Sequence, residues 1–119
     1  MRRLMLLRHA KSSWDDQALR DFDRPLNARG RATAPVIAAW MASNGCVPDR
    51  VLCSTAHRTR ETLAACVPLF AEPLGATLLE ELYEAEADEV LSLIHIGRCR
   101  RSYAALPTHC AGLIIYRRR

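Results

Sequence analysis

The chain has 119 residues, half of them apolar and a quarter charged, a composition typical of one globular domain. Its net charge of +4 comes from residues 98–119, which hold six arginines and no acidic residue, whereas residues 1–97 carry 11 basic and 13 acidic side chains. Nucleic-acid binding is therefore a poor inference, because a basic footprint should cluster on a folded face beside aromatic residues or a known module.

The first predicted element is the apolar run 4–7. It has no polar alternation and so predicts a strand buried on both faces, as in a parallel sheet. Arg8 and His9 follow at its carboxyl end, where open α/β sheets place ligands. The planar guanidinium of Arg8 matches phosphate oxygens, and the His9 imidazole is a nitrogen nucleophile. The pair indicates a candidate anion site, and the alternative is a structural histidine at a strand end.

A helix is predicted from residue 28 to about residue 43. Asn27 is a good N-cap for it, and Gly45 is a natural residue to end it. Pro35 lies inside the pattern and predicts either a kink or two shorter helices. The buried stripe of the helix is expected at Val36, Ile37, Trp40 and Met41, which recur at helical spacing.

The apolar residues 51–54 predict a second short strand, followed by a helix that Ser54 or Thr55 can cap. Arg58 then falls in the first turn of that helix, where free N–H groups and positive potential favour an anion. The two strand ends can therefore converge on one phosphate. The alternative is that Arg58 only solvates the helix.

The pattern weakens towards the carboxyl end. Residues 77–82 predict a third strand, and residues 87–94 fit a short amphipathic helix. Residues 97–110 have no coherent period, and a brief apolar run follows at 112–116. No internal repeat is present.

The five cysteines are an odd number without a C-x-x-C pair, which argues against a disulfide framework and against a zinc site. Cys53 and Cys66 lie in apolar stretches and are expected to be buried. The apolar run 4–7 is too short for a signal peptide, and no later run could span a bilayer. We therefore expect a cytoplasmic protein that binds neither a metal nor a membrane.

Four blocks occur in a fixed order: LLRHAKSSW (6–14), DRPLNARG (23–30), CSTAHRTRET (53–62) and LYEA (82–85). In this order they resemble the histidine phosphatase superfamily, and most closely its branch of small SixA-type phosphohistidine phosphatases. The resemblance implies a phosphoglycerate mutase-like α/β fold, a three-layer α/β/α arrangement with a mainly parallel sheet.

The resemblance also implies the roles of several residues. His9 is the nucleophile and becomes a transient phosphohistidine, Arg8 and Arg58 bind the phosphate, and Ser12 matches a small polar residue near it. Two guanidinium groups can stabilise the equatorial oxygens without a metal, so no cofactor is implied. Glu84 falls near the acid that some relatives use, or it is simply an exposed carboxylate.

The sequence departs from the family at its carboxyl end. The family has a last core strand leading into a His-Asn-Pro-Gly type motif, whose histidine also contacts the phosphate. His109 keeps the spacing from that histidine to the glycine but lacks the preceding apolar strand. Residues 91–102 resemble translated adapter or frameshifted sequence. We therefore expect a partial histidine phosphatase domain over residues 1–96, truncated or frameshifted at its end, and an aberrant Arg-rich tail over 97–119 outside the native fold.

The resemblance implies a metal-independent phosphohistidine phosphatase that acts through a covalent phospho-His9 intermediate. Its partner would be a phosphohistidine-bearing protein, such as a histidine phosphotransfer domain. Two alternatives stay open: a phosphomonoesterase or mutase of the same superfamily acting on a small phosphate ester, and a non-catalytic truncated fragment. The short chain leaves little room for a sugar pocket. Nucleic-acid binding through residues 98–119 is the least favoured interpretation.

Overall fold

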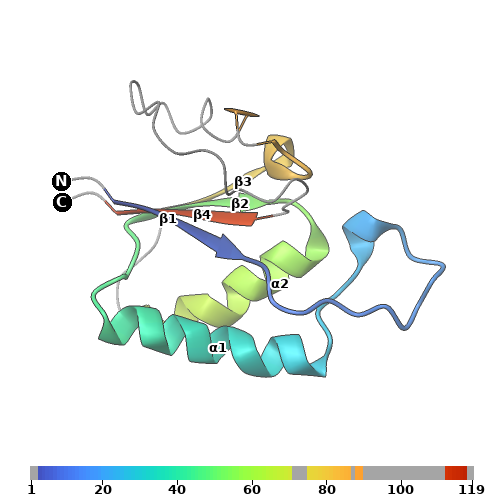
Figure 1. The fold of residues 1–119 in the computed structure, drawn as a ribbon, viewed down its shortest axis with the longest axis horizontal. Coiled ribbons are helices and arrows are strands. Elements are labelled where there is room, and N and C mark those ends of the chain that lie inside the picture. The colour runs from blue at the N-terminus through green and yellow to red at the C-terminus, as the bar shows by residue number, and fades with distance from the viewer. Residues whose placement is uncertain (1–2, 71–74, 87, 90–111, 118–119) are drawn as a thin grey trace.

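The computed structural model describes residues 3–70, 75–86, 88–89 and 112–117 (Figure 1). Its helices and strands are, in chain order, β1 (Arg3–Arg8), α1 (Ala28–Ser43), β2 (Arg50–Ser54), α2 (His57–Cys66), β3 (Gly75–Leu79) and β4 (Gly112–Arg117). Short 3₁₀ turns occupy Asp21–Asp23, Val67–Leu69 and Glu80–Leu82.

The strands form one four-stranded sheet in the order β1-β4-β2-β3. β4 pairs antiparallel with both β1 and β2, and β2 pairs parallel with β3. The strands β1, β2 and β3 therefore run in the same direction, which confirms the mainly parallel sheet. As a consequence, the carboxyl ends of β1 and β2 lie at the same edge of the sheet.

β4 comes from the segment that we expected outside the fold. Its residues pair in register with both neighbours, for example Ile114 with Leu6 and with Leu52. The physical reason is that residues 113–116 are β-branched, aromatic or aliphatic and suit a strand between two others. Residues 112–117 thus lie within the sheet, whereas the rest of the segment and most of the expected helix 87–94 lie outside the described residues. The division into 1–96 and 97–119 stays a prediction.

Both helices lie on the same face of the sheet (Figure 1). On the face of β1 towards the helices, Met5 and Leu7 pack against the buried core. Leu4 and Leu6 lie on the opposite face and are exposed. The expectation that this strand is buried on both faces is therefore wrong. The described residues supply the sheet and one of the two helical layers of the α/β/α arrangement, and neither α1 nor α2 lies against the face of β1 that carries Leu4 and Leu6.

The buried face of α1 differs from the expected stripe. Val36 and Trp40 are 64% and 59% exposed, and Ile37 is also exposed, whereas Met41 is 5% exposed. The residues that face the sheet and α2 are mostly small: Gly30, Ala34, Ala38 and Met41. Apolar residues occur around most of this helix, so their spacing did not identify the face where small side chains allow close packing. Pro35 does not divide the helix, which runs without a break to Ser43.

The amino terminus of α1 is capped as expected. The Asn27 side-chain oxygen accepts a hydrogen bond from the Gly30 N–H at 2.8 Å. The main-chain N–H of Asn27 also donates to the Lys11 carbonyl at 2.9 Å. The cap therefore anchors the start of α1 to the segment that follows β1.

Replacement of Asn27 by alanine is expected to lower the free energy of unfolding by about 1 kcal/mol, because the Gly30 N–H loses its acceptor. Asn44→Ala is the control, since this residue sits at the other end of α1, where its exposed side chain donates to the Trp40 carbonyl. Urea unfolding of both variants measures the difference. Equal effects of the two substitutions would contradict the capping role.

The second strand and helix follow the expected order with a different cap. α2 begins at His57 after Ala56, and no side chain caps it. The prediction of a cap by Ser54 or Thr55 is wrong because the chain needs two more residues to turn out of β2; the Ser54 hydroxyl accepts instead from the Ala56 N–H at 3.3 Å. The third strand lies at Gly75–Leu79, slightly earlier than expected.

The expected burial of Cys53 and Cys66 is confirmed. Burial raises the pKa of the Cys53 thiol to about 12. Across the described residues, we find no helix with the length and apolar character needed to cross a membrane.

Candidate active site

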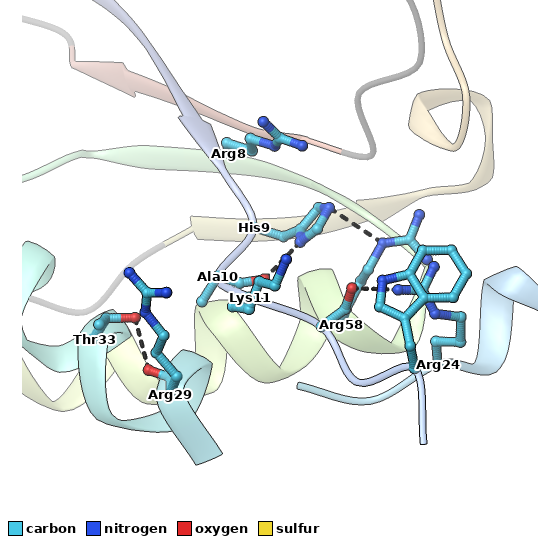
Figure 2. Close-up of a pocket in the computed structure, with 10 residues that line it drawn as sticks. Arg8, His9, Ala10, Lys11, Arg24, Arg29, Thr33 and Arg58 are labelled. Carbon is cyan, nitrogen blue, oxygen red and sulfur yellow. Dashed lines mark hydrogen bonds between the residues drawn. The ribbon is translucent and has the colours of Figure 1, made fainter. Parts of the chain in front are cut away.

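His9 and Arg58 meet at the edge where β1 and β2 end (Figure 2). The Arg58 Nε donates a hydrogen bond to His9 Nε2 at 3.3 Å. Arg58 lies in the first turn of α2 and is only 7% exposed, whereas His9 is half-buried. The convergence expected from the two strand ends is therefore observed for this pair.

Thr62 ties the segment that carries His9 to α2. Its hydroxyl oxygen accepts from the Ala10 N–H at 3.0 Å and lies 2.8 Å from the Arg58 carbonyl, to which the hydroxyl donates. One buried side chain thus fixes the distance between the residue after His9 and the helical turn that holds Arg58. No local pattern in the sequence indicates this role of Thr62.

The hydrogen bonds of the His9 ring assign its tautomer. Nδ1 lies 2.7 Å from the Ala10 carbonyl oxygen, which can only accept, so Nδ1 carries the proton. Nε2 accepts from Arg58, so it carries no proton and its lone pair points towards that arginine. The nitrogen that faces the second arginine is the one able to act as a nucleophile.

The surroundings of His9 favour its neutral form. Burial lowers the pKa of the imidazole, and the nearby cations Arg58, Arg8 and Arg24 lower it further, against a smaller opposing effect of the bond to Ala10. The ordinary value is 6.5. His9 is therefore neutral at neutral pH and available as a base or a nucleophile.

An NMR titration of the His9 ring protons is expected to give a pKa below the ordinary value of 6.5. The unfolded chain takes up this proton at higher pH than the folded chain. The free energy of unfolding should therefore fall as pH decreases from 6.5 towards the lower folded pKa. The contribution of His9 is isolated by comparison with His9→Gln, in which this part of the pH dependence should vanish. Titration of His9 at or above the ordinary value would contradict the prediction.

Ser12 is buried and contributes to the same site. The Arg24 Nη2 donates to its hydroxyl oxygen at 2.6 Å, and the Arg24 Nε donates to the Ser13 carbonyl at 3.0 Å. The Arg24 guanidinium also lies 3.2 Å above the centre of the Trp14 ring. Ser12 is therefore placed by an arginine at the pocket.

These residues line a pocket of about 630 Å³. Figure 2 shows His9 with Arg58 and Arg24 to its right, Arg29 and Thr33 to its left, and Arg8 above it. Its lining residues are Arg8, His9, Ala10, Lys11, Ser12, Trp14, Arg24, Arg29, Thr33 and Arg58. Five of these side chains are cationic and none is acidic, so the pocket favours an anion.

The predicted site residues Arg8, His9, Ser12 and Arg58 all line this pocket. Arg24 lies in the block DRPLNARG (23–30), but no role was predicted for it, because no local pattern distinguishes a buried arginine from an exposed one. Lys11 and Arg29, which are exposed but line the pocket, were missed as well. For these three residues, the only available signal of a site in the sequence was the proximity of histidine and arginine to small polar residues.

Glu84 and His109 are the two residues whose roles stayed open. Glu84 is exposed, does not line the described pocket, and has a positive φ of 55°. His109 lies outside the described residues. Among the residues that the structure describes, no three His, Cys, Asp or Glu side chains gather as metal ligands would.

Known proteins share both sequence and fold with this chain. Residues 4–103 match the model of the histidine phosphatase superfamily (branch 1). An uncharacterized protein of Mycobacterium tuberculosis is 40% identical over 99 residues, which cover 76% of this chain and 61% of that protein. The structure of a protein assigned as phosphohistidine phosphatase SixA from Agrobacterium tumefaciens is 40% identical with a TM-score of 0.71, over 76% of this chain and 59% of that chain.

A second solved structure, the protein histidine phosphatase SixA complexed with tungstate, has 26% identity and a TM-score of 0.68, over 79% of this chain and 59% of that chain. The chain thus spans about three fifths of the length of these relatives. The match of the family model covers most of the chain and includes His9 and Arg58. On this evidence, the chain belongs to the histidine phosphatase superfamily.

Proposed function

We propose that this protein is a metal-independent phosphohistidine phosphatase that acts through a covalent phospho-His9 intermediate. The observation that carries the proposal is the contact of a neutral His9 Nε2 with a buried guanidinium in a pocket without acidic side chains. The SixA relatives support the choice of phosphohistidine as substrate.

The geometry supports a two-step displacement. In the first step, the His9 Nε2 lone pair forms a bond to phosphorus while the phosphorus–nitrogen bond of the substrate breaks, and the substrate ring, protonated at its second nitrogen, leaves as neutral imidazole. Arg8 and Arg58 stabilise the charge on the equatorial oxygens. The positive charge that develops on the His9 ring is stabilised at Nδ1 by the Ala10 carbonyl.

In the second step, water attacks phosphorus and the bond to Nε2 breaks, which releases orthophosphate and restores the neutral imidazole. A phosphoramidate is already labile, so its imidazole leaving group needs little help from an acid. This agrees with the exposed position of Glu84 outside the pocket lining.

The proposed substrate is a phosphohistidine on a partner protein of the histidine phosphotransfer type, in the cytoplasm. The pocket is bordered by several arginines and by the exposed Trp14, features that suit contact with a protein surface. A small phosphate ester remains the alternative substrate of the same chemistry.

Incubation of the purified chain with a phosphotransfer protein carrying ³²P-phosphohistidine tests the proposal. We expect release of orthophosphate in the presence of EDTA, and a transient label on this chain that is stable to alkali and labile to acid. Parallel rates on p-nitrophenyl phosphate separate the two substrates. Faster turnover of the ester would favour the alternative, and binding of phosphate without any label would indicate a non-catalytic protein.

A further inference from the structure

Asp21 connects the two buried arginines of the pocket. The Arg58 Nη1 donates to the Asp21 main-chain carbonyl at 2.6 Å, and the Arg58 Nη2 donates to Oδ2 at 3.1 Å. The Arg24 Nη1 donates to the other carboxylate oxygen, Oδ1, at 2.8 Å. One residue of a short turn therefore holds two guanidinium groups that come from distant parts of the chain.

These contacts determine which edge of Arg58 faces His9. Because both terminal nitrogens of the guanidinium contact Asp21, the Nε–H is directed at His9 Nε2. A guanidinium has five N–H groups, so a second hydrogen on each terminal nitrogen is left for an oxyanion. The orientation of Arg58 is therefore imposed from the side away from the nucleophile.

Asp21 is in turn held by Tyr83. The Tyr83 hydroxyl donates to Asp21 Oδ2 at 2.7 Å, and its ring meets the Phe22 ring edge to face with centroids 5.1 Å apart. Burial acts to raise the pKa of the Asp21 carboxyl, but the bonds from Tyr83, Arg58 and Arg24 outweigh it and hold the pKa below the ordinary value. Asp21 is therefore ionised at neutral pH, as these contacts require.

We propose that Asp21 is a positioning residue of this site, which holds Arg58 in the orientation that presents its donors to an oxyanion at His9, and that Tyr83 holds Asp21. Only the catalytic consequence of this inference rests on the proposed function. The effects on anion binding and on His9 can be measured without turnover.

The direction of the effect on anion binding distinguishes positioning from simple charge. A carboxylate near an anion site repels the anion, so its removal should strengthen binding if charge were the only role. If Asp21 positions Arg58, the Asp21→Asn variant should instead bind orthophosphate roughly tenfold more weakly, or worse, since charge-assisted hydrogen bonds that orient the arginine are lost. Isothermal titration calorimetry with orthophosphate measures this.

The His9 titration gives an independent readout. In the parent, Arg58 is among the causes that lower the pKa of His9, together with burial, Arg8 and Arg24. When Arg58 is released from its orientation in Asp21→Asn, the pKa of His9 should rise towards its ordinary value. A purely structural role that leaves Arg58 in place would not produce this rise.

Asp23→Asn is the matched control. Asp23 lies in the same 3₁₀ turn, and its carboxylate pairs with the exposed Arg20 at 2.9 Å. We expect this variant to keep the orthophosphate affinity and the His9 pKa of the parent.

Tyr83→Phe is a second test of the positioning role. It keeps the charge of Asp21, removes one hydrogen bond to it, and should weaken orthophosphate binding by roughly threefold. This variant tests the positioning role if the Asp21 variant does not fold. In an Arg58→Lys background, Asp21→Asn should add little further loss.

Unchanged or tighter orthophosphate binding in Asp21→Asn, with His9 titrating as in the parent, would overturn the inference. In that folded variant, weaker binding and a raised His9 pKa support it. If the parent forms no phosphoenzyme while the two readouts still change, the proposed function fails and the positioning role of Asp21 stands.

Discussion

Replacement of His9 by alanine is expected to abolish the phosphoenzyme and to slow release of phosphate from phosphohistidine by at least about a thousandfold. The variant lacks the Nε2 lone pair, which forms the bond to phosphorus in the proposed mechanism, while the arginines of the pocket remain. Trapping of ³²P on the purified protein, followed by phosphate-release kinetics, measures both effects. Turnover by His9→Ala at the parent rate would refute the mechanism.

His57→Ala is the matched control for this experiment. His57 is a histidine in the first turn of α2, next to Arg58. It pairs with Glu61 and does not line the pocket. We expect this variant to keep phosphoenzyme formation and turnover within about twofold of the parent. Orthophosphate titration of His9→Ala should show that its arginines still bind an anion, so a loss of turnover without a loss of binding identifies the nucleophile.

Substitution of Gly30 by alanine is expected to disturb both the fold and the pocket. A Cβ at this position would overlap the Lys11 carbonyl oxygen and lie 3.0 Å from the Lys11 nitrogen. These are main-chain atoms, so either α1 or the segment after β1 must move. Although alanine favours a helix over glycine, we expect the free energy of unfolding to fall by about 1–3 kcal/mol, which is typical of overpacking.

The pocket should change in the same variant, because Lys11 lies two residues after His9. Orthophosphate affinity measured by calorimetry is therefore expected to fall together with stability in Gly30→Ala. Arg31→Ala, at the next position of α1, removes an exposed side chain and its 3.6 Å contact with Glu61. That control should stay within about 0.5 kcal/mol of the parent in urea unfolding. A Gly30→Ala protein as stable as the control would mean that the close approach of the two segments is unimportant.

Some elements were predictable because their signals are local. Asn27 caps α1 through an oxygen that reaches a main-chain N–H three residues later, and such a contact is encoded within one turn. Gly45 adopts a positive φ of 67° just after the helix, which a glycine tolerates. The two strands before His9 and Arg58 were recognised from short apolar runs that end at polar residues.

Other features could not be recognised from local patterns. The expected stripe of α1 is exposed at Val36 and Trp40, because a helix with apolar residues around most of its surface gives no unique face. The small residues that pack inside depend on how closely α2 and the sheet approach. β4 was missed for a similar reason, since a short apolar run between arginines acquires its place only by pairing with β1 and β2.

The sequence by itself determined the chemistry of this protein: an imidazole beside a guanidinium at the end of one strand, and a second guanidinium at the start of a helix after another. The tertiary structure alone decided which arginines are buried and how they are oriented. Asp21 and Arg58 are separated by 37 residues, and their contact forms only when the loop after β1 folds over α2. Such contacts leave no periodic or local trace, because their energy depends on distance in space and not on spacing along the chain.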